Sequence, residues 1–102
     1  MQVRSFASWQ ILSYINLKWD NQIVSPTIFY DGPYRFYFYA SDRREPIHVH
    51  VGRDDKSAKI WLDSLVIAFN RQFSQKELRG ILRIVARRRA EIEDRWHDFF
   101  AE

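Results

Sequence analysis

The chain has 102 residues, of which 46% are hydrophobic and 28% are charged, and it carries a formal net charge of +3. These values are typical of one small globular domain, and they exclude a disordered chain. The chain contains no cysteine, which excludes disulfides, thiolate catalysis and cysteine-based zinc sites. It shows neither a run of about 18 apolar residues nor a signal-peptide pattern, so we expect a cytoplasmic protein without membrane contact.

Residues 1–24 give two conflicting patterns. Apolar residues recur at helical spacing over residues 5–16, which predicts a helix there. Apolar residues between positions 11 and 19 also alternate as in a strand, so the pattern leaves a strand open. We interpret residues 1–24 as an N-terminal extension that packs on a single domain formed by residues 25–102.

Several β-prone segments follow the extension, with short polar loops between them. The strongest is Tyr34–Ala40, which is almost wholly aromatic, and the next two are Ile47–Val51 and Ser57–Leu62. Shorter runs at residues 27–30 and 65–69 lie on either side of them. Strands joined by such short loops pair antiparallel, which predicts a β-meander of three to four strands.

A long helix is predicted from Ser74 to the end of the chain. Ser74 and Glu77 have the spacing of a capping box, in which each side chain binds the backbone N–H of the other residue. The apolar face of this helix should pack on the sheet, because neither element can bury its apolar side alone. The predicted fold class is therefore α+β, with the meander packed on one long C-terminal amphipathic helix. The apolar face comprises Leu78, Ile81, Leu82, Val85, Ile92, Trp96 and Phe99.

Several motifs in a fixed order link the chain to a known family. They include Gly-Pro-Tyr-Arg-Phe-Tyr-Phe-Tyr, Glu-Pro-Ile-His-Val-His-Val, Ala-Lys-Ile-Trp-Leu-Asp and Phe-Ser-Gln-Lys-Glu-Leu. With these motifs the chain resembles the prokaryotic domain-of-unknown-function 4160 family over about residues 25–102. The resemblance implies a component of a toxin–antitoxin-like gene pair. One departure is Pro46-Ile47, where members commonly carry two prolines before the first histidine.

The predicted strands divide their side chains between two faces, because residues i and i+2 share a face. One face collects Phe, Ile, Val and Leu and receives the helix. The opposite face, called the open face below, collects aromatic, imidazole and cationic side chains. Its predicted members are Arg35, Tyr37, Tyr39, His48, His50, Lys59 and Trp61.

The chemistry of the open face suits a phosphodiester ligand. Aromatic rings stack on unpaired bases, and Lys and Arg neutralise phosphate. The predicted RNA-binding residues on this face are Arg35, Tyr37, Tyr39, Lys59 and Trp61. The competing interpretation is structural, with this face covered by residues 1–24 or by a second copy of the chain in a homodimer.

His48 and His50 are the sharpest chemical feature of the chain. Two imidazoles at this spacing could act as base and acid on a ribose 2′-hydroxyl, or could ligate one metal ion. Spacing fixes no third ligand, and Asp42, Glu45 and Asp63 are the possibilities. We therefore assign no metal and no cofactor. The structural alternative is that both histidines form hydrogen bonds with neighbouring Tyr or Asp side chains.

The predicted C-terminal helix carries a cationic stripe along its first half. Lys76, Arg79, Arg83 and Arg87 follow steps of three and four residues and should face solvent together. Positive charge early in a helix opposes the helix dipole, so local stability does not explain it. We predict that this cationic stripe binds a phosphate backbone or an acidic partner protein.

The sequence as a whole favours a small binding or regulatory protein of a toxin–antitoxin-like pair. Its predicted partner is RNA or a cognate acidic protein. The first alternative is a metal-independent ribonuclease-like toxin that uses His48 and His50. A further alternative is a metal-binding domain built on the same two histidines.

Overall fold

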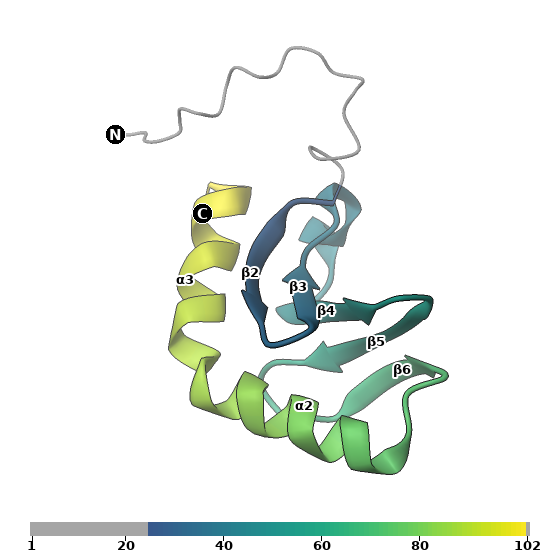
Figure 1. Ribbon diagram of the computed structural model, residues 1–102. Coiled ribbons are helices and arrows are strands. Elements are labelled where there is room, and N and C mark those ends of the chain that lie inside the picture. Colours follow the sequence, from purple (N-terminus) through teal and green to yellow (C-terminus); the bar gives the residue numbers. More distant parts are fainter. Residues whose placement is uncertain (1–24, 102) are drawn as a thin grey trace.

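The computed structural model describes residues 25–101. The helix predicted over residues 5–16 and the covering role of residues 1–24 lie outside the described residues. Figure 1 shows a twisted sheet and two helices that follow one another along it in an L shape. Within the part of the chain described here, no helix is long and apolar enough to cross a membrane.

Among the described residues, the sheet has five antiparallel strands in the order β2-β3-β4-β5-β6. The predicted meander is confirmed, but the predicted count of three to four strands was too low. The two outer runs are full strands because each pairs with its neighbour, as Phe29 does with Phe36 and Phe69 with Lys59. The strands are β2 Thr27–Asp31, β3 Tyr34–Tyr37, β4 His48–Arg53, β5 Lys56–Trp61 and β6 Ile67–Arg71.

The last strand begins two residues later than the run that predicted it. Leu65 has a φ of 60°, in the left-handed region, and so belongs to the turn before β6. The amide N–H of Leu65 donates to the carbonyl of Trp61, and the N–H of Trp61 donates to the carbonyl of Val66, both at 2.9 Å. These bonds close the turn before the strand pairing starts.

The aromatic strand predicted over residues 34–40 is shorter in the structure, because β3 ends at Tyr37. The chain then enters a 3₁₀-helix, η3 (Ala40–Arg44). The Tyr39 N–H donates to the Asp42 carboxylate at 2.8 Å, and the Asp42 N–H donates to the Tyr39 carbonyl at 3.0 Å. This local capping replaces strand pairing and turns the chain from β3 towards β4.

A two-residue turn, Gly32-Pro33, joins β2 to β3 between the paired residues Asp31 and Tyr34. Gly32 has a φ of 59°, whereas the ring of Pro33 holds its φ negative. This order of signs identifies a type II′ turn, whose twist matches that of the flanking strands.

Helix α2 (Gln75–Arg87) begins with the predicted capping box. The Ser74 hydroxyl oxygen accepts from the Glu77 N–H at 3.1 Å, and the Glu77 carboxylate accepts from the Ser74 N–H at 3.3 Å. The predicted start of the helix is therefore confirmed.

The prediction of one long helix is wrong, because the chain bends at Arg88 before α3 (Arg89–Phe100). Arg88 has φ −106° and ψ 21°, away from helical values. Its guanidinium lies 3.5 Å over the Phe29 ring and donates to Asp31 at 3.1 Å and Glu91 at 2.9 Å. These contacts tie the bend to the end of β2, and no glycine or proline marks it in the sequence.

The core lies between one face of the sheet and the two helices. Phe36, Val49 and Ile60 are completely buried on three successive strands, as are Ile81 in α2 and Ile92 in α3. This confirms the predicted helix-receiving face. Both described C-terminal helices therefore pack on the same face of the sheet.

Two glycine substitutions should have opposite effects on stability. Gly80→Ala should stabilise the protein by about 0.5–1 kcal/mol, because Gly80 lies inside α2 and a Cβ there would meet the Arg83 guanidinium only at 3.9 Å. Gly32→Ala should destabilise it by about 1 kcal/mol, because alanine is strained at a φ of 59°. Urea unfolding beside the wild type measures both effects. Effects of the same sign would contradict the conformations described here.

Candidate functional site

The strand register arranges the open-face residues in rows that cross the sheet. One row, called the first row, runs through all five strands as Tyr30, Arg35, Gly52, Ser57 and Arg71, each paired with the next. A second row runs as Tyr37, His50, Lys59 and Phe69. His48 pairs with Trp61 beyond them. The register thus places the predicted strand residues of the open face side by side.

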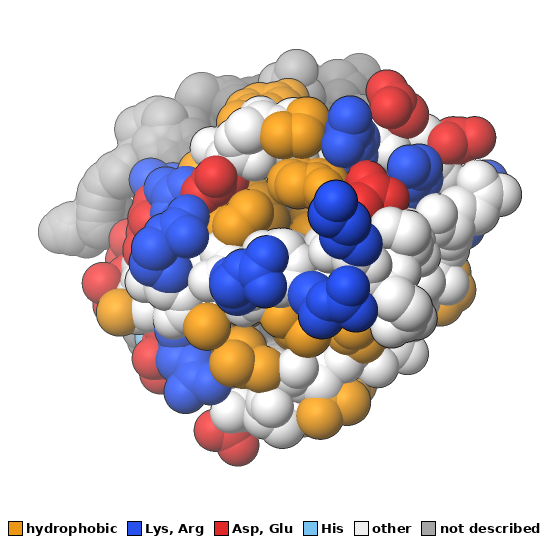
Figure 2. Space-filling model, turned by 60° about the horizontal axis from the view of Figure 1, so that its bottom comes forward, with side chains coloured by type: hydrophobic (Ala, Val, Ile, Leu, Met, Phe, Trp, Pro, Cys, Tyr) orange, Lys and Arg blue, Asp and Glu red, His pale blue; other side chains and the backbone are white. Residues whose placement is uncertain are grey.

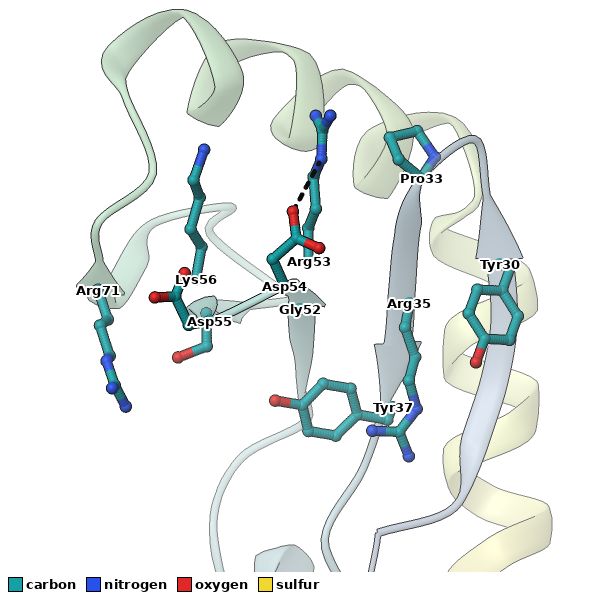
Figure 3. A pocket seen from close by; sticks show the side chains of 11 residues that line it. Tyr30, Pro33, Arg35, Tyr37, Gly52, Arg53, Asp54, Asp55, Lys56 and Arg71 are labelled. Carbon is teal, nitrogen blue, oxygen red and sulfur yellow. Dashed lines mark ion pairs between the residues drawn. The ribbon is translucent and has the colours of Figure 1, made fainter.

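A hollow of about 420 Å³ lies where the first row crosses the sheet. Gly52 and Ser57 leave this space because their side chains are absent or small. The Tyr37 ring lies against β4, with Cε1 3.4 Å from the position of the Cβ that Gly52 lacks. Figure 3 shows Arg35 and Arg71 on opposite sides of the hollow, with Tyr37 between them.

Cationic side chains outnumber carboxylates around the hollow. Arg53 and Lys56 reach the Glu77 carboxylate at 3.4 Å and 3.2 Å, so part of their charge is already paired. Arg71 forms no ion pair with another described residue. The charged lining is Arg35, Arg53, Lys56 and Arg71 against Asp54 and Asp55.

Arg35 is held in place at the side of the hollow. Its Nε donates to the Thr27 hydroxyl at 2.7 Å, and its guanidinium also donates to the Ser25 carbonyl. The guanidinium lies 4.3 Å from the centre of the Tyr37 ring. Because it binds only neutral oxygens, its positive charge remains available to an anion.

Tyr37 is a neutral phenol over a wide pH range. Burial, followed by the neighbouring Tyr39 hydroxyl, raises the pKa of Tyr37 from 10.0 to about 12. The phenol therefore donates a hydrogen bond near neutral pH and cannot serve as a base there.

Asp42 lies between the two histidines. Its Oδ2 is 3.0 Å from His50 Nε2, and its Oδ1 is 3.1 Å from His48 Nε2. The Asp42 and His48 side chains are 7% and 0% exposed, and that of His50 is 13% exposed. We call Asp42, His48 and His50 the Asp-His-His cluster.

The electrostatics of the cluster favour an ionised carboxylate. Burial raises the pKa of Asp42, but the contacts with His48 and His50 and the hydrogen bond from the Tyr39 N–H outweigh it. The pKa of Asp42 consequently lies well below its usual range. The carboxylate is thus negatively charged throughout the physiological pH range.

The burial of His48 bears on the predicted base–acid pair. Trp61 and Trp96 pack edge-on against its ring, with centroids at 5.4 Å and 5.3 Å. A general base must come within hydrogen-bond reach of its substrate, and the walls around His48 leave no such approach. The use of His48 and His50 as base and acid stays a prediction, and this burial counts against it.

Two other residues that were predicted to bind a ligand already contact neighbouring side chains. Lys59 pairs with Glu45 at 2.5 Å and lies 4.5 Å over the Trp61 ring. Tyr39 is 36% exposed and meets the His50 ring edge-on at 4.7 Å. These residues line the cluster more closely than the hollow.

The predicted cationic stripe lies on α2 and is called the α2 stripe below; it faces solvent away from the open face. Lys76, Arg79 and Arg83 are exposed and form no ion pair with another described residue, whereas Arg87 reaches Asp31 at 3.1 Å. Figure 2, which brings the α2 end forward, shows Lys and Arg side chains gathered there with apolar side chains between them. The structure therefore separates two cationic surfaces.

The sequence profile described as "Domain of unknown function (DUF4160)" matches residues 34–97. The chain belongs to this family. The match includes the Asp-His-His cluster and most of the hollow, but β2 lies outside it. No curated protein and no solved structure matches the chain.

Sequence reasoning missed several residues of these sites. Asp42 was only one of three possible partners for the histidines, because it lies on a separate element. Tyr30, Gly52, Ser57 and Arg71 were not assigned to a site. Only the cross-strand register would have identified these four residues, and that register depends on loop lengths and bulges.

Asp42→Ala should lower the free energy of unfolding by about 1–3 kcal/mol, because it leaves His50 Nε2 and the Tyr39 N–H without their common partner. Asp55→Ala is the matched control, since Asp55 is exposed and has no ion pair with a described residue. Urea unfolding measures the difference. Equal stability of the two variants would show that the cluster contributes nothing to folding.

The phenol of Tyr37 should ionise only near pH 12, as its raised pKa requires. Its neutral form contributes stability that is complete below pH 10 and is lost as the pH rises through about 12. A pH titration of the tyrosine Cζ signals by NMR measures this, with Tyr37→Phe to assign the signal. A Tyr37 signal that titrates near pH 10 would contradict the packing described.

Proposed function

We propose that this domain binds single-stranded nucleic acid on its open face, with RNA as the predicted form. The observation that carries the proposal is the hollow at the first row, where Arg35 and Arg71 flank a floor of small residues. A backbone phosphate between the two guanidinium groups would receive charge-assisted hydrogen bonds from both sides.

Exposed aromatic rings supply the second part of a nucleic-acid surface. Tyr30 on β2 and Phe69 on β6 are 66% and 53% exposed, although large aromatic residues are usually buried. Both lie on the open face by their register with Arg35 and Lys59. Stacking on such rings holds bases without regard to their sequence.

The spacing of the exposed rings favours an extended ligand over a single nucleotide. Tyr30 and Phe69 lie on the two edge strands, which four strand spacings separate. At about 4.8 Å per spacing, the two edge strands are roughly 19 Å apart. A ligand that contacts both rings and the arginines between them must therefore be a chain, as an oligonucleotide is.

An acidic protein partner is the competing ligand, and its best surface is the α2 stripe. Carboxylates need cations but gain little from exposed aromatic rings, and the stripe offers cations without the hollow. The open face combines both kinds of group. A role within a toxin–antitoxin-like pair fits either ligand and stays a prediction.

Fluorescence anisotropy with a labelled single-stranded RNA tests the proposal. Tyr30→Ala should weaken binding about 10-fold, because one stacked base contributes about 1–3 kcal/mol. Arg71→Ala should weaken it and reduce the dependence of log Kd on log salt by about one phosphate contact. Arg79→Ala, on the opposite face, is the matched cationic control and should leave both quantities unchanged.

The opposite pattern would overturn the proposal. If Arg79→Ala weakens binding and Arg71→Ala and Tyr30→Ala do not, the α2 stripe is the nucleic-acid surface. Affinity that does not change with salt, or no RNA binding by the wild type, would reject nucleic-acid binding altogether. Gel analysis of the RNA after each titration also detects cleavage, which the ribonuclease alternative requires.

A further inference from the structure

His48 Nε2 is the most unusual polar atom among the described residues. It is buried and lacks a hydrogen-bond partner. The Asp42 carboxylate lies 3.1 Å away, yet not along the direction in which the ring nitrogen could donate or accept. A buried polar atom without a partner is rare in native proteins, because its lost hydration costs about 1–3 kcal/mol. This atom therefore points to something that binds it.

The other ring nitrogen of His48, Nδ1, has a clear partner. Nδ1 lies 2.8 Å from the Pro46 carbonyl oxygen, which can only accept, so Nδ1 carries the proton. In the neutral imidazole, Nε2 then carries a lone pair that lies beside the Asp42 carboxylate. Two electron-rich atoms at this distance repel one another unless a proton or a metal ion lies between them.

A third donor completes the arrangement. The ligand atoms of Asp42, His48 and His50 all lie within 4.8 Å of one another. Metal bonds of about 2.0–2.2 Å require neighbouring ligand atoms to be roughly 3.3 Å apart in tetrahedral geometry. His50 Nε2 lies 3.0 Å from Oδ2 of Asp42 and His48 Nε2 lies 3.1 Å from Oδ1, so each imidazole nitrogen is near this spacing from a different oxygen of the carboxylate.

We propose that Asp42, His48 and His50 form a binding site for a divalent transition-metal ion, of the class of zinc or iron(II). Two imidazoles and one carboxylate are a common ligand set for these ions. The site is distinct from the hollow and does not depend on nucleic-acid binding.

The surroundings of the cluster match those of metal ligands in other proteins. A ligating histidine almost always donates its second N–H to a carbonyl or carboxylate, as His48 does to Pro46. The Asp42 carboxylate is oriented by the Tyr39 N–H at 2.8 Å. Trp61 and Trp96 make the His48 side dry, while the His50 side chain, 13% exposed, lies toward solvent. Metal entry is therefore expected from the His50 side.

Competition with a chromophoric chelator tests the site, with Zn²⁺ as the probe and the untagged full chain freed of metal beforehand. The wild type should bind one Zn²⁺ per chain. His50→Gln should weaken this binding on the order of 100-fold or more, because even the loss of a partner behind a ligand costs 10- to 100-fold. His97→Gln is the matched control, since His97 lies at the far end of α3, outside the cluster, and should bind as the wild type does.

A spectroscopic measurement keeps the test independent of affinity. Co²⁺ bound to the wild type should give visible absorption bands of a low-coordinate site with nitrogen ligands, and His50→Gln should lack them. Circular dichroism checks that His50→Gln is folded. The comparison of this variant with the wild type tests the metal site even if Asp42→Asn or His48→Gln does not fold. Three results would each overturn the proposal: no Zn²⁺ bound by the wild type, equal affinity of His50→Gln, or an equal loss in His97→Gln.

Discussion

The apolar half of each strand must be buried against α2 and α3, and this one-sided burial governs the rest of the structure. A strand directs alternate side chains to opposite faces, so burying Phe36, Val49 and Ile60 turns their neighbours to the other face. That face holds the hollow and the Asp-His-His cluster. Both candidate sites therefore use strand side chains that this alternation places opposite the core.

Tyr37 connects these two sites on the open face. Its ring lies against Gly52 at the hollow and stacks on His50, with centroids 5.4 Å apart and planes at 19°. The ring therefore forms a wall of the hollow and supports one histidine of the cluster. A Cβ at Gly52 would lie 3.4 Å from Cε1 of this ring, an ordinary van der Waals contact, so the glycine leaves room in the hollow but is not required by the packing.

Charge is divided between the two sides of the domain. On the open face, Arg35 binds neutral oxygens and Arg71 has no ionic partner among the described residues, so their charge is directed to solvent. On the helix side, Arg88 joins Asp31 to Glu91 and stabilises the bend between the helices. The net charge of +3 does not reveal this division, because a cation in a structural ion pair and a cation that can bind a ligand each count as one positive charge.

Local features of the sequence determined the meander, the start of α2 at Ser74 and the division of apolar and polar residues between the faces. Each depends on residues close in the chain, through alternation or capping. Tertiary structure decided two further features. One is the bend at Arg88, which an ion pair with Asp31 on a distant strand stabilises. The other is the contact of Asp42 with His48 and His50. Tertiary structure also decided the row from Tyr30 to Arg71, because the register of five strands depends on bulges and turns that no spacing rule specifies.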